Sequence, residues 1–204
     1  MKTIVYQHES EITKYLIERD PKLSELFDKQ KQVTVYVSDN YYESLIDTII
    51  AQQLSGKAAA TISKRVHTFF NEDITPENLI KADDESLRAL GVSYPKIKYL
   101  KSLAEHMIDQ SVDFSQLDNM SNQEVIDMLI QIKGIGVWSA QMFLIFSLGR
   151  EDVFSPLDLG LRNAVKHLYQ NPDLTVPEIE KISENWSPYR SVVSHFLWHI
   201  WDAK

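Results

Sequence analysis

Residues 129–165 read LIQIKGIGVWSAQMFLIFSLGREDVFSPLDLGLRNAV, and the rest of the chain is best understood from this stretch. Gly134 and Gly136 predict a tight turn that ends one helix and begins another, because glycine has no Cβ and can adopt a positive φ. The second helix, expected over 137–148, is apolar nearly all round, as a buried helix is. A loop follows it and carries one carboxylate, Asp158, between apolar neighbours.

The glycine turn predicts a backbone site for an anion. The first N–H groups of a helix have no partner inside it, and they point outward at the positive end of the helix dipole. A phosphate group suits such a helix start. A helical hairpin that turns on glycine and binds nothing is the alternative. Lys133 before the turn and Trp138 after it favour the anion site.

The run IKGIGVWSAQ, followed by EDVFSPLDLGLRNAV, resembles the helix-hairpin-helix (HhH-GPD) DNA glycosylase superfamily, and most of all its 3-methyladenine DNA glycosylases of alkylation repair. That branch typically has a G-I-G-x-W-[ST]-A hairpin and an aspartate in F-x-P-x-D or F-P-x-x-D. Further matching segments are IIAQQLSGKAA (49–59), LGVSYPKIKYLKSLA (90–104) and WSPYRSVVSHFLWHIWD (186–202). The four blocks stand in the family's order and cover most of the chain from residue 41 onward.

The periodicity of apolar residues predicts an all-α fold of about ten helices without a substantial sheet. Its only strand-like run is QVTVYV (32–37), for which no partner strand is evident. The resemblance implies a two-lobed helix-hairpin-helix glycosylase fold. The expected parts are a single unit over 1–204, a central lobe at about 40–117, and a second lobe from 1–39 and 118–204 that carries the hairpin 130–138 and the catalytic loop 150–160.

Asp158 is the residue on which the implied chemistry depends. A glycosidic bond breaks through an oxocarbenium-like sugar cation, which a nearby carboxylate can stabilise while it activates the attacking water. The resemblance implies this role for Asp158, acting by base flipping on alkylated purines such as 3-methyladenine and 7-methylguanine. A helix N-cap is the alternative for Asp158. Asp152 is the rival acid, which the family pattern makes structural.

An aromatic base pocket is also implied by the resemblance, with Trp138, Trp198 and Tyr189 as candidates and Met142 where some members carry a tyrosine. An indole face attracts a cationic base, although a buried core position is the alternative for each tryptophan. Bifunctional relatives place their Schiff-base lysine where this chain has Trp138. A monofunctional hydrolase without lyase activity is therefore expected.

Two other functions remain open. One is a non-catalytic helix-hairpin-helix module that only binds DNA, which would not need the carboxylate of Asp158. The other is an enzyme of the same fold that acts on a different lesion, such as hypoxanthine or etheno-adenine.

The polar run at 52–55 separates two expected helices. An enzyme that flips a nucleotide out of a duplex fills the gap with a side chain. The resemblance implies that this loop supplies the wedge, so Gln53 and Leu54 are candidates. A core position for Leu54, with the glutamines capping a helix end, is the alternative.

The hairpin residues Lys133, Gly134, Ile135 and Gly136 are, by the same resemblance, the DNA-binding element. Members of the superfamily often hold a monovalent cation there through backbone carbonyls, here those of Ile130, Ile132 and Ile135. No cofactor is expected to be required beyond such a structural Na⁺ or K⁺. His195 and His199 are spaced i, i+4 but have no evident third metal ligand.

The chain has 204 residues, no cysteine and a formal net charge of −8. The lack of cysteine excludes disulfides, thiolate zinc sites and iron–sulfur clusters, and it fits a cytoplasmic protein. A nucleoid-associated location is expected for a protein that acts on DNA. No signal peptide or membrane span is apparent. The expected partner is double-stranded DNA with damaged bases, bound by a monomer. Because the net charge is negative, a basic face on an acidic body is expected, and Lys96, Lys98 and Lys101 are candidates for it. A solvated helix face that contacts no DNA is the alternative for each of these lysines.

Overall fold

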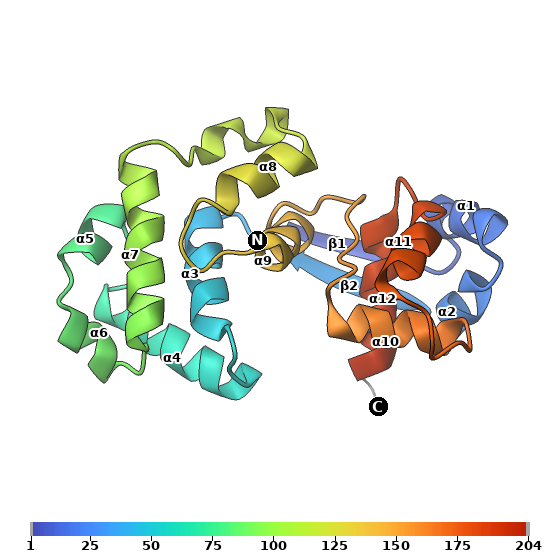
Figure 1. Ribbon diagram of the computed structural model, residues 1–204, viewed down its shortest axis with the longest axis horizontal. Coiled ribbons are helices and arrows are strands. Elements are labelled where there is room, and N and C mark those ends of the chain that lie inside the picture. The colour runs from blue at the N-terminus through green and yellow to red at the C-terminus, as the bar shows by residue number, and fades with distance from the viewer. Residues whose placement is uncertain (1, 203–204) are drawn as a thin grey trace. The chain divides into compact units, whose positions relative to one another are not determined.

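The computed structural model describes residues 2–202, which are mainly helical (Figure 1). The chain divides into two compact units. We call Asn40–Phe143 the central unit, and Met1–Asp39 together with Leu144–Lys204 the terminal unit. None of the described helices combines the length and the apolar character that crossing a bilayer requires.

The central unit is a stack of helices whose starts are set by capping side chains. Asn40, Ser55, Thr75 and Asp83 each accept a hydrogen bond from the backbone N–H three residues on. Ser121 and Glu124, three residues later, form a capping box at the start of a further helix. The elements are α3 (Tyr41–Ala51), α4 (Gly56–Phe69), α5 (Pro76–Lys81), α6 (Asp84–Ala89), α7 (Tyr94–Ile108), the 3₁₀ helix η1 (Phe114–Asn119), α8 (Asn122–Leu129) and α9 (Val137–Met142).

The terminal unit is assembled from both ends of the chain. Its apolar core joins Phe27 to Phe196, whose rings meet edge to face with centroids 4.8 Å apart, and encloses the fully buried Trp186. The elements are β1 (Lys2–Gln7), α1 (Glu11–Arg19), α2 (Leu23–Lys29), β2 (Gln32–Val37), α10 (Leu159–Leu168), α11 (Val176–Glu184) and α12 (Arg190–Asp202). A turn of π-helix, η2 (Phe143–Ser147), follows α9 at the point where the chain passes from one unit to the other.

One buried carboxylate fastens the N-terminal segment to the C-terminal helices of this unit. Asp20, at the end of α1, accepts hydrogen bonds from the hydroxyl of Tyr169 and from Nε1 of Trp186, the latter at 2.8 Å. Burial and the neighbouring carboxylate raise the pKa of Tyr169, so its hydroxyl remains a donor. A buried acid is tolerated where its lone pairs are satisfied in this way.

The small sheet departs from the sequence-based expectation. β2 was expected to lack a partner, but it pairs antiparallel with β1, in a register that places Lys2 opposite Val37 and Tyr6 opposite Val33. The prediction missed β1 because the two strands lie about 30 residues apart, with two helices between them. The fold is otherwise all-α as predicted, with twelve α-helices within residues 2–202.

Two expectations about residues 118–148 are corrected. The hairpin belongs to the central unit, so the boundary lies at 143/144 and not near 117. The reason is that α7 holds it: the Ser102 hydroxyl accepts the N–H of Lys133 at 3.2 Å. The second correction concerns the helix after the hairpin. It is not buried all round, since Val137 and Trp138 are 43% and 42% exposed, and it changes to π-helix after Met142.

Candidate active site

Asp158 lies at the N-terminus of α10 and is half-buried. Its Oδ1 accepts two hydrogen bonds, from the N–H of Leu161 at 2.8 Å and from Nε1 of Trp198 at 3.0 Å. The N-cap alternative is therefore confirmed, but the second donor is not part of a cap. Two N–H groups converging on one oxygen fix the direction of the carboxylate.

The surroundings of Asp158 are apolar and open. Leu157 and Leu159, on either side of it, are 55% and 63% exposed. Gly160 gives the carboxylate room: a Cβ there would lie 3.2 Å from Oδ1 of Asp158 and 3.5 Å from Cδ1 of Trp198. These two leucines form the apolar rim that the sequence predicts beside the acid.

Trp198 is one member of an aromatic cluster on α12 and η2. Its ring centroid lies 5.2 Å from that of Phe146 and 5.9 Å from that of His195. His195 also meets the edge of Phe146 at 5.3 Å and stacks on Tyr6 at 6.1 Å. This packing holds the Trp198 indole in the orientation that donates to Asp158.

His195 supports the cluster as a neutral ring. Burial lowers the pKa of His195 from 6.5 to about 4. It is therefore uncharged near pH 7 and does not compete with a cationic ligand for the Asp158 carboxylate. His199, one turn further along α12, is exposed, so the two histidines do not share an environment.

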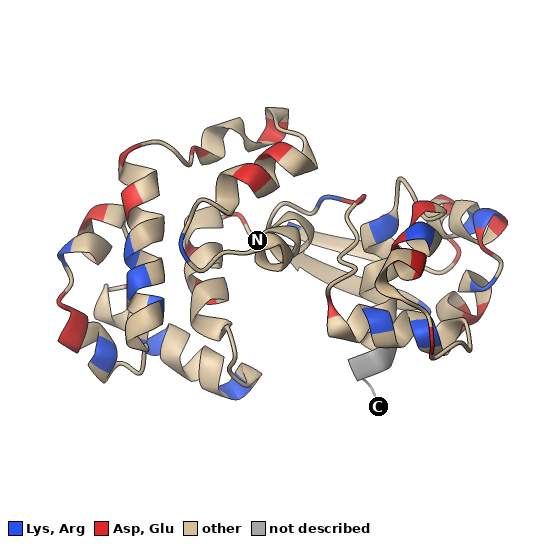
Figure 2. Ribbon diagram, viewed as in Figure 1, with Lys and Arg blue, Asp and Glu red and all other residues tan. Residues whose placement is uncertain are grey.

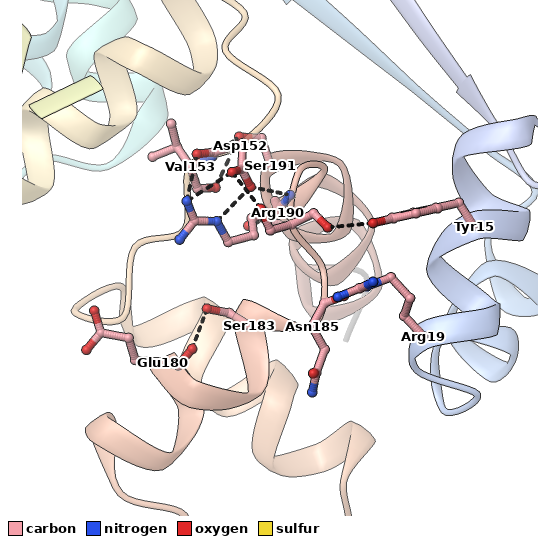
Figure 3. Close-up of polar contacts among 11 residues, drawn as sticks. Tyr15, Arg19, Asp152, Val153, Glu180, Ser183, Asn185, Arg190 and Ser191 are labelled. Atoms are coloured by element: carbon pink, nitrogen blue, oxygen red, sulfur yellow. Dashed lines mark hydrogen bonds and ion pairs between the residues drawn. The ribbon is translucent and has the colours of Figure 1, made fainter. Parts of the chain in front are cut away.

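The rival acid, Asp152, forms an ion pair with Arg190 that fastens the loop at 150–160 to α12 (Figure 3). Its Oδ1 accepts Nε of Arg190 at 2.7 Å, and its Oδ2 accepts the Ser187 hydroxyl at 2.9 Å. Burial alone would raise the pKa of Asp152, but these hydrogen bonds and the charge of Arg190 hold that pKa below its usual value. This supports the structural reading of Asp152.

A second clamp on the same loop involves Ser191. Its hydroxyl accepts the N–H of Val153 at 2.9 Å and donates to the carbonyl of Val153 at 3.0 Å, and its own N–H donates to the carbonyl of Glu151 at 2.8 Å (Figure 3). The loop that leads to Asp158 is thus attached to the helix that carries Trp198. The hydrogen bonds that hold this loop and the indole of Trp198 together position the Asp158 carboxylate.

The other predicted pocket residues, Tyr189, Trp138 and Met142, belong to different elements. Tyr189 packs edge-on against Tyr15 of α1, with centroids 5.6 Å apart, which is a packing role in the core of the terminal unit. Trp138 and Met142 are both on α9 in the central unit, four residues apart and so on one face of that helix. Trp138 is exposed enough to meet a ligand.

The hairpin has the form predicted for an anion site. Gly134 has a φ of +85°, and a Cβ there would lie 2.2 Å from the ring of Tyr99, so only glycine fits. Gly136 has a φ of −100°, precedes α9 as its N-cap without a side-chain cap, and has open space where a Cβ would be. The first glycine therefore shapes the turn, and the second leaves the helix N-terminus accessible.

Backbone carbonyl oxygens are the kind of ligand that the predicted monovalent cation requires, and the hairpin supplies them. The carbonyl of Ile132 accepts the N–H of Ile135 at 3.1 Å, which leaves it a second lone pair. Ile130 ends α8 just before the turn. Within residues 2–202, no three His, Asp or Glu side chains are grouped so as to hold a metal ion.

The predicted wedge residues lie on the loop between α3 and α4, which we call the plug loop (residues 52–55). Gln53 is exposed and has a φ of +56°, a left-handed conformation that is unfavourable for a residue with a side chain. Leu54 is 38% exposed and is not in the core. Both candidates therefore project from the central unit, and the core alternative for Leu54 is wrong.

The lysines of α7 do not form the expected basic edge. Lys96 donates to the carbonyl of Ile50 at 2.8 Å, and burial lowers its pKa. Lys101 is paired with Asp84, so Lys98 is the exposed one of the three. Other cations lie on α4 (Figure 2). There an open groove of about 700 Å³ is lined by Lys57, Ala60, Thr61, Lys64, Arg65, Thr68, Phe69 and Leu90.

Some contributors to the site were not predicted. Phe146 was taken as part of a buried helix, because nothing in an apolar run signals a π-turn that leaves one ring exposed. The contact between His195 and Trp198 could have been predicted, because residues 191, 195 and 198 lie on one face of α12. Contacts made across 38 or 82 residues, such as that of Arg190 with Asp152 and that of Gln52 with Gly134, leave no local signal.

Comparison with known proteins identifies the family to which this chain belongs. A family profile described as "HhH-GPD superfamily base excision DNA repair protein" matches residues 46–188. DNA-3-methyladenine glycosylase 1 of Schizosaccharomyces pombe is 36% identical over 96% of this chain and 92% of its own length. The DNA-3-methyladenine glycosylase of Saccharomyces cerevisiae is 32% identical over 91% of this chain and 77% of its own.

Solved structures show the same likeness. The crystal structure of a DNA-3-methyladenine glycosidase from Bacillus halodurans is 35% identical, with a TM-score of 0.89 over 97% of this chain and 92% of its own. The S. pombe 3-methyladenine DNA glycosylase, solved in complex with abasic DNA, is 36% identical with a TM-score of 0.75, over 93% of this chain and 91% of its own.

Proposed function

Because this chain belongs to the HhH-GPD superfamily of base excision DNA repair proteins, we propose that it is a monofunctional DNA N-glycosylase that removes alkylated purines. The observation that supports this most is the Asp158 carboxylate, oriented by the Trp198 indole and surrounded by an exposed apolar rim. Substrates of this class, 3-methyladenine and 7-methylguanine, carry a positive charge and leave as neutral bases. They need no acid to protonate them.

In the proposed mechanism the damaged nucleotide leaves the duplex before the bond breaks. As the C1′–N bond cleaves, its electron pair goes to the base and C1′ becomes positive. Asp158 stabilises that cation and orients a water. The water oxygen bonds to C1′ and its proton passes to the carboxylate, so the products are free base and an abasic sugar.

The hairpin is proposed to hold the DNA strand. The N–H groups at the start of α9 would contact a phosphate, and Gly136 lets the backbone approach it. A Na⁺ or K⁺ bound to the carbonyls of Ile130, Ile132 and Ile135 would add positive charge beside that phosphate. Trp138 would offer an indole face to a cationic base, with a cation–π attraction of roughly 0.5–2 kcal/mol.

Replacement of the carboxylate tests the proposal. We expect wild type to release free base from methylated duplex DNA, and Asp158→Asn to release it at least about a hundredfold more slowly, which corresponds to about 2.7 kcal/mol of barrier. Asp173→Asn is the matched control, because Asp173 is an exposed carboxylate in the same unit, and it should retain the wild-type rate.

Each other outcome points to a different function. Equal rates for wild type and Asp158→Asn would reject Asp158 as the catalytic group. Binding of methylated DNA without release of any base would favour the non-catalytic binding module. Release of hypoxanthine or etheno-adenine in preference to alkylated purines would assign the same chemistry to another lesion.

The absence of lyase activity is a separate proposal. Trp138 occupies the position after the hairpin where a Schiff-base lysine would be required, and an indole cannot form an imine. Borohydride should therefore trap no covalent complex between the protein and damaged DNA. A trapped complex that disappears in a lysine variant would contradict the proposal.

A further inference from the structure

One hydrogen bond joins the plug loop to the hairpin inside the central unit. Gln52 follows α3 as its C-cap, and its Nε2 donates to the carbonyl of Gly134 at 2.8 Å. The two residues are 82 positions apart in sequence. Because a carbonyl only accepts, the side-chain amide must present its NH₂ group here, which fixes the orientation of the Gln52 side chain.

Helix α7 holds the same two segments from one face. Lys96 donates to the carbonyl of Ile50, at the end of α3, at 2.8 Å. Tyr99 packs against the hairpin glycine, and Ser102 accepts the N–H of Lys133. Spacings of three residues place the three side chains along one side of the helix. Helix α7 thus contacts both the end of α3 and the hairpin, and Gln52 is the residue that joins the plug loop directly to the hairpin.

The residue next to this hydrogen bond has the least favourable backbone conformation in the plug loop. Gln53 is the immediate neighbour of Gln52 and is held at a φ of +56°. A non-glycine residue keeps such a conformation only where its surroundings impose it. The Gln52 side chain, anchored at the hairpin, and the N–H of Leu54, which donates to the carbonyl of Ala51 at 3.1 Å, supply that constraint.

We propose that Gln52 is a positioning residue that couples the hairpin's hold on the DNA backbone to insertion of the plug loop into the duplex. This inference rests on the proposed function. Extruding a paired nucleotide costs a few kcal/mol, and a loop already ordered at the hairpin does not lose further conformational freedom when it inserts. Once the hairpin has bound a phosphate, the plug residue is in register with the strand that the hairpin holds.

The test compares extrusion of paired and unpaired lesions. Gln52→Leu removes the donor, and Gln52→Glu keeps the shape but turns a carboxylate toward a carbonyl. Gln123→Leu is the matched control, because exposed Gln123 donates at 2.8 Å to Asp127 on its own helix and links no two segments. A 2-aminopurine beside the lesion reports extrusion by fluorescence, independently of bond cleavage, and single-turnover release of base reports the chemistry.

We expect both Gln52 variants to extrude a paired lesion about tenfold more slowly than wild type, and to process the same lesion opposite a gap within about twofold of it. The melting temperature and the affinity for the gapped duplex should match those of Gln123→Leu. A purely structural defect would slow both substrates alike, and that result would overturn the proposal, as would unchanged extrusion of the paired lesion.

The failure of this inference differs from the failure of the proposed function. If wild type extrudes the lesion but releases no base, the glycosylase proposal fails and the comparison of extrusion rates still decides the role of Gln52. If wild type releases base and the Gln52 variants extrude it equally fast, only the coupling fails. A wild type that produces no fluorescence change on any damaged duplex would overturn both.

Discussion

At the scale of the residue, the site depends on what touches Asp158. The sequence singles out Asp158 as the candidate acid through its surroundings in residues 151–165, and Trp198 as a candidate aromatic of the base pocket. It did not indicate that the indole N–H donates to Asp158, because a side-chain hydrogen bond between residues 40 positions apart has no local pattern. The rotamer of Trp198 and its packing within the aromatic cluster decide whether this hydrogen bond forms.

Trp198→Phe separates the hydrogen bond from the ring contact. The phenyl ring can still pack against Phe146, but nothing donates to Oδ1 of Asp158 in place of Nε1. We expect release of alkylated base to slow about tenfold, which corresponds to the loss of one hydrogen bond to a charged group. In the Asp158→Asn background the same change should have much less effect. Fully additive losses would show that Trp198 acts independently of the acid.

His195 predicts a dependence of stability on pH. Its pKa is about 4 in the folded protein and near 6.5 when unfolded, so between these values the unfolded chain binds more protons. Stability due to the neutral ring is therefore complete above about pH 6.5 and is lost as the pH falls toward 4. The total is on the order of 3 kcal/mol.

His195→Phe should remove this dependence while keeping a flat ring against Tyr6 and Trp198. The measurement is the free energy of unfolding by denaturant at pH 7.5 and at pH 4.5, for both proteins. We expect wild type to lose more stability than the variant over that interval. Parallel losses would mean that the folded protein admits the charged ring.

At the scale of the element, local signals predicted helix starts well and long-range pairing poorly. The capping box at Ser121, the proline in the first turn after Thr75 and the helix end at Asp20 are all set by residues close by in the sequence. Such signals act within four residues. β1, the 3₁₀ turn at 114–119 and the π-turn at 143–147 were missed, because tertiary packing and not local preference sets them.

The two hairpin glycines should respond differently to alanine. Gly134→Ala forces a Cβ into the Tyr99 ring and a positive φ on an L-residue, so we expect a loss of about 1–3 kcal/mol in stability together with weaker DNA binding. Gly136→Ala meets no atom within 4 Å and should fold normally while it weakens DNA binding by crowding the phosphate. Denaturant melts and fluorescence anisotropy with abasic duplex would measure the two effects. Equal stability losses would be inconsistent with the different backbone conformations.

At the scale of the whole molecule, a protein of net charge −8 must hold a polyanion with local cations. We expect the logarithm of its DNA affinity to fall with the logarithm of salt at a slope of about −3, since few phosphates are neutralised. Lys133→Gln should reduce that slope by about one. Lys29→Gln changes the net charge equally but removes a lysine paired with Glu25 in the terminal unit, and it should leave the slope unchanged. If Lys133→Gln and Lys29→Gln changed the slope equally, DNA affinity would depend only on the net charge of the protein.

The division into units has a consequence for synthesis on the ribosome. Residues 40–143 are contiguous, so the part with the hairpin and plug loop can complete its core as soon as it has emerged, at about 5–20 residues per second. Residues 1–39 have no such option: their apolar side chains, Phe27 among them, can pack only after the segment that carries Phe196 has been made. A nascent polypeptide therefore completes the hairpin and the plug loop before Asp158 can be held by Trp198. Until then the apolar side chains of residues 1–39 remain without the core that buries them in the folded protein.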